Sequence, residues 1–82
     1  MNSPIGKVTH FYDKLLVAII DLEKGGLKVG DEIKFQKGDQ EFSQKIESLQ
    51  IEHKDVESVK KGDSFGLKVT QPTKPGTLVF MM

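Results

Sequence analysis

The amino-acid sequence predicts an all-β fold, and more specifically a small closed antiparallel β-barrel of six to seven strands. A Gly-Asp pair recurs beside stretches in which apolar and polar residues alternate, at residues 27–33 and 59–65. Residues 73–78 carry a weaker version of the same motif, in which threonine follows the glycine. Glycine adopts backbone conformations that other residues avoid, and aspartate hydrogen-bonds the turn before a strand begins. No segment has the periodicity of an amphipathic helix. Short strands with evenly spaced turn signals are typical of barrels and sandwiches, and closure would protect the sheet edges.

Three strands are predicted in the first half of the chain. Residues 5–11 are rich in β-branched and aromatic side chains and form the first. Residues 15–21 form the second, and its apolar residues are consecutive, so we expect it to be buried on both faces. Residues 22–26 are expected to be a loop, because adjacent glycines disfavour a helix. Residues 31–37 alternate cleanly, with the isoleucine and the phenylalanine facing inward.

A hairpin turn with Gly38 and Asp39 at its centre is predicted next. Residues 41–52 then form a long strand whose phase changes, since its apolar residues lie at even positions first and at odd positions later. A regular strand cannot turn both sets inward, because its side-chain period is two. A β-bulge or sharp bend is therefore expected near Glu47 and Ser48.

The last third of the chain closes the predicted barrel. Residues 53–61 are expected to hold either one short helical turn or a brief strand around the two valines. Residues 64–70 alternate again, with every second side chain from Phe65 onward facing inward. Residues 71–76 contain two prolines and are expected to be a loop. Residues 77–82 form the closing strand, with its leucine and phenylalanine on one face, and tie the C-terminus into the sheet.

Composition limits the class of protein. A chain of 82 residues and 9.2 kDa corresponds to one domain, residues 1–82. Twelve basic residues, all lysine, balance twelve acidic ones, which disfavours a strong autonomous nucleic-acid binder but leaves a weak or composite RNA contact open. Cysteine is absent, so disulfides and thiolate metal sites are excluded. The longest apolar run is too short to span a bilayer and no signal-peptide pattern is visible, so we expect a cytoplasmic protein without membrane contact.

Four spaced motifs carry a resemblance to a known family. They are Ile-Gly-Lys-Val at residues 5–8, Leu-Lys-Val-Gly-Asp-Glu-Ile at 27–33, Ile-Glu-Ser-Leu-Gln-Ile at 46–51 and Lys-Gly-Asp-Ser-Phe-Gly-Leu-Lys-Val at 61–69. In this order they resemble domain two of the translational GTPases, the β-barrel of elongation factor Tu and initiation factor two. A tighter resemblance is to small stand-alone translation elongation factor-like proteins and to the barrel that ends some collagenase-like peptidase-family proteins, with residues 42–56 the most characteristic stretch.

The resemblance implies a binding role. In the translational GTPases, domain two contacts the GTPase module, the ribosome and, in some members, the aminoacyl end of tRNA; the peptidase-family proteins are linked to RNA hydroxylation. This chain has no Gly-x-x-x-x-Gly-Lys-Ser/Thr motif, so we expect the isolated domain not to bind GTP, and no cofactor is implied.

No catalytic or metal-binding constellation is recognisable in the sequence. The two histidines lack a ligand set at suitable spacing, and no serine lies in a nucleophile motif, so we expect a protein that is not an enzyme. The candidate binding residues lie in a polar-aromatic cluster at the first hairpin, in the loop after the long strand and in a lysine pair before a turn: His10, Tyr12, Lys14, His53, Lys54, Lys60 and Lys61.

Each candidate also has an ordinary structural interpretation. Isolated histidines are more often surface or strand residues, Tyr12 can cap the barrel end while Phe11 belongs to the core, and paired lysines are usually solvated turn charges. If the first hairpin and residues 53–54 meet at one rim, they form the natural binding site, because loops on a rigid scaffold carry function.

Two functional hypotheses follow. The first is a non-enzymatic binding module, similar to translation-factor domain two, that contacts a ribosome, a tRNA or a translation-related protein. The second is an accessory protein–protein module for a peptidase-like RNA-modifying enzyme. The sequence leaves the oligomeric state and the identity of the partner open.

Overall fold

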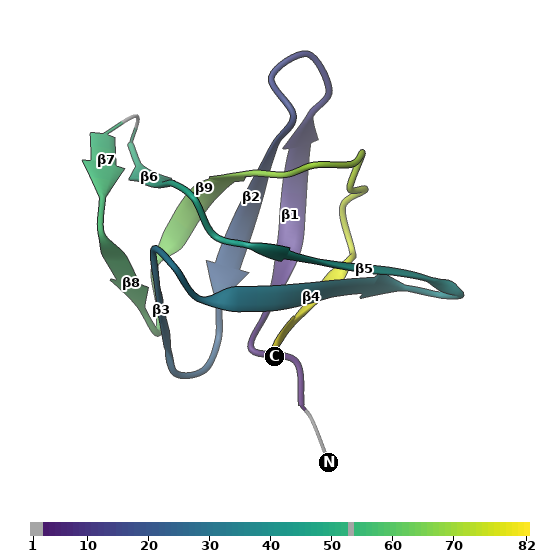
Figure 1. Ribbon diagram of the computed structural model, residues 1–82, viewed down its shortest axis with the longest axis horizontal. Coiled ribbons are helices and arrows are strands. Elements are labelled where there is room, and N and C mark those ends of the chain that lie inside the picture. Colours follow the sequence, from purple (N-terminus) through teal and green to yellow (C-terminus); the bar gives the residue numbers. More distant parts are fainter. Residues whose placement is uncertain (1–2, 53) are drawn as a thin grey trace.

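The computed structural model describes residues 3–52 and 54–82, and within them the chain forms ten β-strands and no helix (Figure 1). The strands are β1 Gly6–Tyr12, β2 Val17–Leu22, β3 Gly26–Lys28, β4 Glu32–Lys37, β5 Gln40–Lys45, β6 Leu49–Ile51, β7 Lys54–Val56, β8 Ser58–Lys60, β9 Ser64–Lys68 and β10 Leu78–Met81. The all-β prediction is confirmed. The structure has more strands than the six or seven expected. The difference comes from four strands of only three residues each, β3, β6, β7 and β8.

The strands form one large sheet and one small one. Eight strands pair in the order β5-β4-β10-β1-β2-β9-β6-β7, and β3 pairs with β8. Every pairing is antiparallel. The predicted closed barrel is not confirmed, since β5 and β7 end the large sheet without pairing with each other. In place of a backbone ladder, the Gln44 side chain reaches from β5 to the end of β9 and the residues just after it, donating to the Lys68 carbonyl at 2.9 Å and accepting from the Thr70 amide at 3.0 Å.

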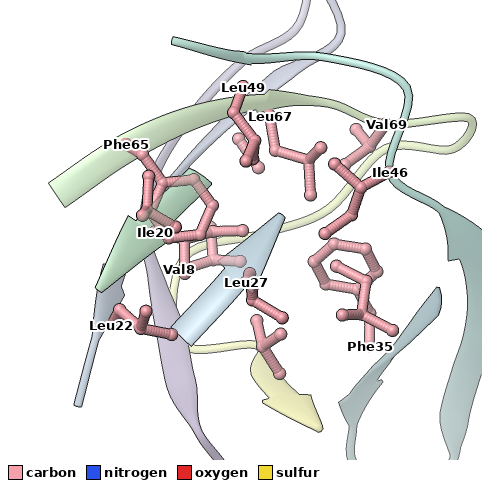
Figure 2. Close-up of a cluster of buried hydrophobic side chains, with 14 residues drawn as sticks. Val8, Ile20, Leu22, Leu27, Phe35, Ile46, Leu49, Phe65, Leu67 and Val69 are labelled. Atoms are coloured by element: carbon pink, nitrogen blue, oxygen red, sulfur yellow. The ribbon is translucent and has the colours of Figure 1, made fainter. Parts of the chain in front are cut away.

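One hydrophobic core fills the space that the curved sheet encloses. Figure 2 shows its side chains converging from both sheets. The ten largest of the fully buried side chains come from nearly every part of the chain: Val8, Ile20, Leu22, Ile33, Phe35, Ile46, Leu49, Phe65, Leu67 and Val79. The Phe35 ring also stacks on Phe42 with centroids 4.9 Å apart.

Strand alternation predicts most of the buried faces correctly. Ile33 and Phe35 on β4 are fully buried, as are Phe65 and Leu67 on β9, with the following Val69 also in the core. The expectation that the second strand is buried on both faces is wrong.

In β2, only alternate residues are buried: Ala18, Ile20 and Leu22 face the core, whereas Val17 and Ile19 are half-buried on the opposite face. In β10 the core residue is Val79, and Leu78 lies on the outer face with 38% of its surface exposed. Tying of the C-terminal segment into the sheet is confirmed by the pairing of β10 with both β1 and β4.

The predicted long strand over residues 41–52 is interrupted rather than bulged. The ladder ends at Lys45 and resumes at Leu49, and Ile46 enters the core between the two strands. The chain leaves the ladder where the phase of the apolar residues changes, so the predicted position near Glu47 and Ser48 is confirmed, and of the two predicted forms the bulge is not observed there. The sheet does contain a bulge, but in β1, between Val8 and His10.

Three short strands lie in or beside the segments predicted as a loop over residues 22–26 and as a helical turn or brief strand over residues 53–61. The expected loop over residues 22–26 ends at Gly26, where β3 begins and pairs with β8. In the region 53–61, the brief-strand alternative is confirmed as β7 and β8, although residue 53 lies outside the described residues. The hairpin turn at Gly38 and Asp39 is confirmed, with the positive φ of 61° that a glycine at the first central position favours.

The recurring glycine signal corresponds to one turn built three times. In the first turn, the Asp31 amide donates to the Lys28 carbonyl at 3.1 Å, and the Asp31 carboxylate accepts the Lys28 amide at 3.1 Å. Gly30 supplies the required positive φ of 102°. Residues 60–63 repeat both bonds at 3.0 and 2.9 Å. Residues 74–77 keep the backbone bond at 3.2 Å, and a threonine hydroxyl that donates to the same carbonyl at 2.6 Å takes the place of the carboxylate.

Each turn also clamps one core residue. The backbone amide of the turn glycine donates to the carbonyl of the core residue. The backbone amide of the core residue in turn donates to the carbonyl of the residue that follows the glycine. All six bonds measure 2.8 or 2.9 Å. The clamped residues are Ile46 for the turn at 28–31, Leu22 for the turn at 60–63 and Val8 for the turn at 74–77.

Candidate functional site

A groove of about 500 Å³ lies on the outer face of the large sheet, across β1, β2, β9 and β6. We call it the outer groove. Its lining is mostly apolar at the floor and polar at the rim: His10, Tyr12, Leu15, Val17, Ile19, Gln50, Glu52, Ser64, Phe65 and Gly66.

The β1 bulge sets which side chains face this groove. Beyond the bulge, His10 lies opposite Ile19 and Tyr12 lies opposite Val17, which places all four side chains on the outer face. Thr9 at the bulge is partly buried, and its hydroxyl donates to the Ile19 carbonyl at 3.3 Å. The apolar floor of the groove therefore comes from β2, and its aromatic edge comes from β1.

Gly66 keeps the middle of the groove hollow. It pairs with Ile19 on one side and with Gln50 on the other. A Cβ atom at this position would lie 3.4 Å from Val17 Cγ1 and 3.5 Å from Ile19 Cδ1, so any larger side chain would cover the two apolar residues of the floor. The absence of a side chain at this position is what exposes them.

The β1–β2 hairpin presents apolar surface beside the groove. Leu15 is 65% exposed and Tyr12 is 52% exposed. Leu16, next in the chain, has a positive φ of 54°, and its carbonyl accepts the Val69 amide at 2.8 Å. A positive φ costs a leucine about 1–2 kcal/mol, so the hairpin is held in this shape by its neighbours rather than by local preference.

Two of the polar side chains at the border of the groove are hydrogen-bonded to acidic residues beside it. Gln50 donates to Asp55 at 3.1 Å on one side, and Ser64 donates to Asp21 at 2.5 Å on the other. Among the residues that the structure describes, no group of three histidine, cysteine or acidic side chains could hold a metal ion. The arrangement is suited to recognising an apolar surface with a polar border.

The structure brings some of the sequence-predicted site residues together and separates others. His10 and Tyr12 line the outer groove, and Lys14 is exposed on the adjoining hairpin. Glu52, from the β6–β7 connection, lines the same groove, and the exposed Lys54 follows at the start of β7. The first hairpin and the β6–β7 connection thus border one groove, although His53 lies outside the described residues.

The lysine pair does not belong to this group. Lys60 and Lys61 are exposed in the turn that follows β8, away from the tip of the β1–β2 hairpin (Figure 1). The candidate binding role of these two lysines stays a prediction that is separate from the outer groove.

Sequence reasoning missed the apolar floor, namely Leu15, Val17 and Ile19. The signal was present in the consecutive apolar residues 15–20. A strand with one face in the core needs apolar residues only at alternate positions, so the additional ones must cover another surface or lie exposed. We had assigned them to a second buried face.

The chain is similar in sequence to part of a larger protein. The chain is 39% identical over 79 residues to an uncharacterised protease of Methanocaldococcus jannaschii, a match that covers 95% of this chain and 19% of the protease. It therefore spans about a fifth of the length of that relative. No protein-family model matches the chain.

The fold is similar to that of the C-terminal domain of a putative peptidase. Two crystal structures of the C-terminal domain of a putative U32 peptidase from Geobacillus thermoleovorans, one of them a selenomethionine variant, superpose with a TM-score of 0.87 and 20% sequence identity. The matches cover 95% of this chain and 98% and 90% of those domains. The predicted resemblance to a terminal domain of peptidase-family proteins is supported. The resemblance to a stand-alone translation factor-like protein gains no support from these matches.

No described segment forms a helix of the length and apolar character needed to cross a bilayer.

Proposed function

We propose that this chain is a non-catalytic accessory module that docks on a peptidase-like catalytic unit through the outer groove. The observation that carries the proposal is the match to the Methanocaldococcus protease, because one fifth of that protein resembles nearly all of this chain. The remaining four fifths offer a catalytic unit on which a module of this kind would rest. The proposal follows the second hypothesis from the sequence; the translation-related hypothesis has no supporting observation.

The chemistry of the outer groove is consistent with docking on a protein. An exposed leucine and tyrosine beside two half-buried aliphatic residues form an apolar patch that monomeric proteins tend to avoid. Covering a side chain such as Leu15 or Tyr12 contributes about 1–2 kcal/mol each, which is enough for a modest, specific complex when the polar border is also matched.

The test uses the part of the Methanocaldococcus protease that lies outside the matched residues. This part is mixed with the present chain, and complex formation is measured by sedimentation velocity. The protease's own matched segment, added in the same way, serves as the positive control. We expect both to form a one-to-one complex, and the protease segment to compete with this chain for one site. Failure of this chain to bind while the protease segment binds would overturn the proposal, and so would failure of both.

Variants then locate the contact surface. Leu15→Asp places a charge on a side chain that is already exposed, so folding is retained while binding is reduced at least tenfold. Lys61→Ala, at an exposed residue that does not line the groove, is the matched surface control and should bind as tightly as the wild type. Equal loss of binding in the two variants, or none in Leu15→Asp, would remove the outer groove from the interface.

A further inference from the structure

The free edge of β5 is a second unoccupied surface of the molecule. β5 pairs only with β4 and stands at the end of the large sheet. The two-residue turn at Gly38 and Asp39 makes Lys37 and Gln40 a hydrogen-bonded pair. Bonding alternates along an antiparallel ladder, so the backbone amide and carbonyl groups of Glu41 and Ser43 point away from β4.

These backbone groups are available for a partner. Within residues 3–52 and 54–82, no backbone or side-chain group bonds to the backbone of Glu41 or Ser43 on that side, and both residues are exposed. Farther along the strand, Gln44 bonds to the chain after β9 and closes the edge. The open stretch is therefore limited to residues 40–43.

A groove of about 590 Å³ runs beside this open stretch, between the β4–β5 hairpin and the loop that follows β9. Its apolar wall is the stacked pair Phe35 and Phe42. The opposite wall is fixed in place: the ammonium group of Lys37 donates to the Pro75 carbonyl at 2.7 Å, and the Thr73 side chain is buried. We call this the edge groove, and its shape does not depend on a partner.

We propose that the edge groove binds an extended peptide segment of a partner protein, which adds to β5 as an antiparallel strand. Two outward amides and two outward carbonyls in a row are met together only by another extended backbone. We call the residues of the bound peptide guest residues. The guest residue that pairs with Phe42 lies on the same face of the sheet as the Phe42 ring and is apolar. This inference concerns a surface separate from the outer groove and does not depend on the docking proposed above.

Charge defines the next guest position. Asp39 and Glu41 are exposed carboxylates on the β4–β5 hairpin, whereas the two lysines of the groove lie elsewhere: Lys37 donates to a carbonyl of the loop after β9, and Lys74 is exposed on that loop, across the groove from β5. The one nearby ion pair, Lys34 with Glu41, is 3.8 Å long and its carboxylate side chain is 57% exposed, so it competes only weakly. The guest residue opposite Glu41 is therefore basic, and the recognised segment carries an apolar residue followed directly by lysine or arginine.

The test uses a synthetic peptide, N-acetyl-Thr-Thr-Val-Lys-Thr-amide, titrated into the isotope-labelled full chain and followed by amide chemical shifts. In antiparallel pairing its valine lies opposite Phe42 and its lysine opposite Glu41. We expect saturable shifts centred on residues 40–43, with a dissociation constant in the range of about 0.1–1 mM for so short a strand. The matched control peptide carries an N-methyl group on the threonine before the valine, which removes one backbone hydrogen bond and should weaken binding about fivefold or more.

Two variants of the chain complete the test. Glu41→Lys should weaken the lysine peptide and strengthen the same peptide with glutamate in place of lysine. Ser43→Pro removes an amide that faces away from β4, so the ladder is retained and binding is lost; circular dichroism checks the fold. The proposal is overturned if the N-methylated peptide binds equally well, if shifts centre elsewhere, or if none appear at 5 mM peptide, about fivefold above the weakest affinity expected. Shifts at residues 40–43 that grow with protein concentration alone would instead assign the edge to a second copy of the chain.

Discussion

Replacing Gly30 by valine isolates the energetic role of the repeated turn. Gly30 has a φ of 102°, and a Cβ atom built there meets no heavy atom within 4 Å. The substitution therefore introduces no clash, and its whole cost is the conformation that an L side chain must adopt. A strained φ of this kind costs about 2 kcal/mol, and a β-branched side chain lies at the upper end of the range.

The cost should be visible in equilibrium unfolding. A domain of this size loses about 1 kcal/mol of stability per molar urea, so Gly30→Val should lower the urea midpoint by about 2 M. In thermal unfolding, the same change corresponds to a drop of about 8–16 °C. Gly62→Val, at a φ of 93° and again with open space around the site, should give a loss of the same size.

A matched control separates conformation from bulk. Gly66 lies in β9 outside the positive-φ region, and an added Cβ would make ordinary contacts of 3.4 Å and longer. Gly66→Ala should therefore change the urea midpoint by less than about 0.5 M, well below the turn variants. If Gly30→Val and Gly62→Val are no less stable than Gly66→Ala, the assignment of these glycines as conformational requirements is refuted.

Four further variants test the core, the turn cap and the bridge beside the open edge. Phe35→Ala removes a fully buried ring and should cost about 3–5 kcal/mol, which is seen as a large fall in the thermal midpoint; Phe42→Ala, at the half-buried partner ring, should cost less. Asp63→Ala loses the acceptor for the Lys60 amide and should cost about 1 kcal/mol in urea unfolding, and an effect below a few tenths would show that the cap is unimportant. Gln44→Ala should speed hydrogen exchange at the Thr70 amide without affecting core amides; unchanged exchange would mean that the bridge does not hold β5.

Local turn chemistry explains why so much of the fold was predictable. The Gly-Asp pairs at 30–31 and 62–63 specify both a positive φ and a side-chain acceptor, and the structure has both. Alternation identified the inward faces of β4 and β9 because each has one face in the core. In both cases the information lies within a few adjacent residues.

The errors come from features that depend on distant parts of the chain. The sequence gives no sign that the Gln44 side chain rather than a strand ladder connects β5 to the chain after β9, because that contact joins residues far apart. The role of Val17 and Ile19 was also misjudged, since an apolar run is equally compatible with a strand between two layers and with one exposed to a groove. The bulge in β1 carries no glycine or proline that would have marked it.

The three turn clamps explain how the sheet remains curved although its two end strands do not pair. Each clamp fixes a turn to a buried residue in a distant segment, Ile46, Leu22 or Val8, through two short backbone bonds. The curvature is therefore set at the core, and neither the outer groove nor the open backbone of β5 contributes a clamp bond. The exposed groove-lining side chains and the free backbone of β5 can change or engage a partner without altering the bonds that define the fold, which is the arrangement expected of a scaffold that carries its binding surfaces on loops and edges.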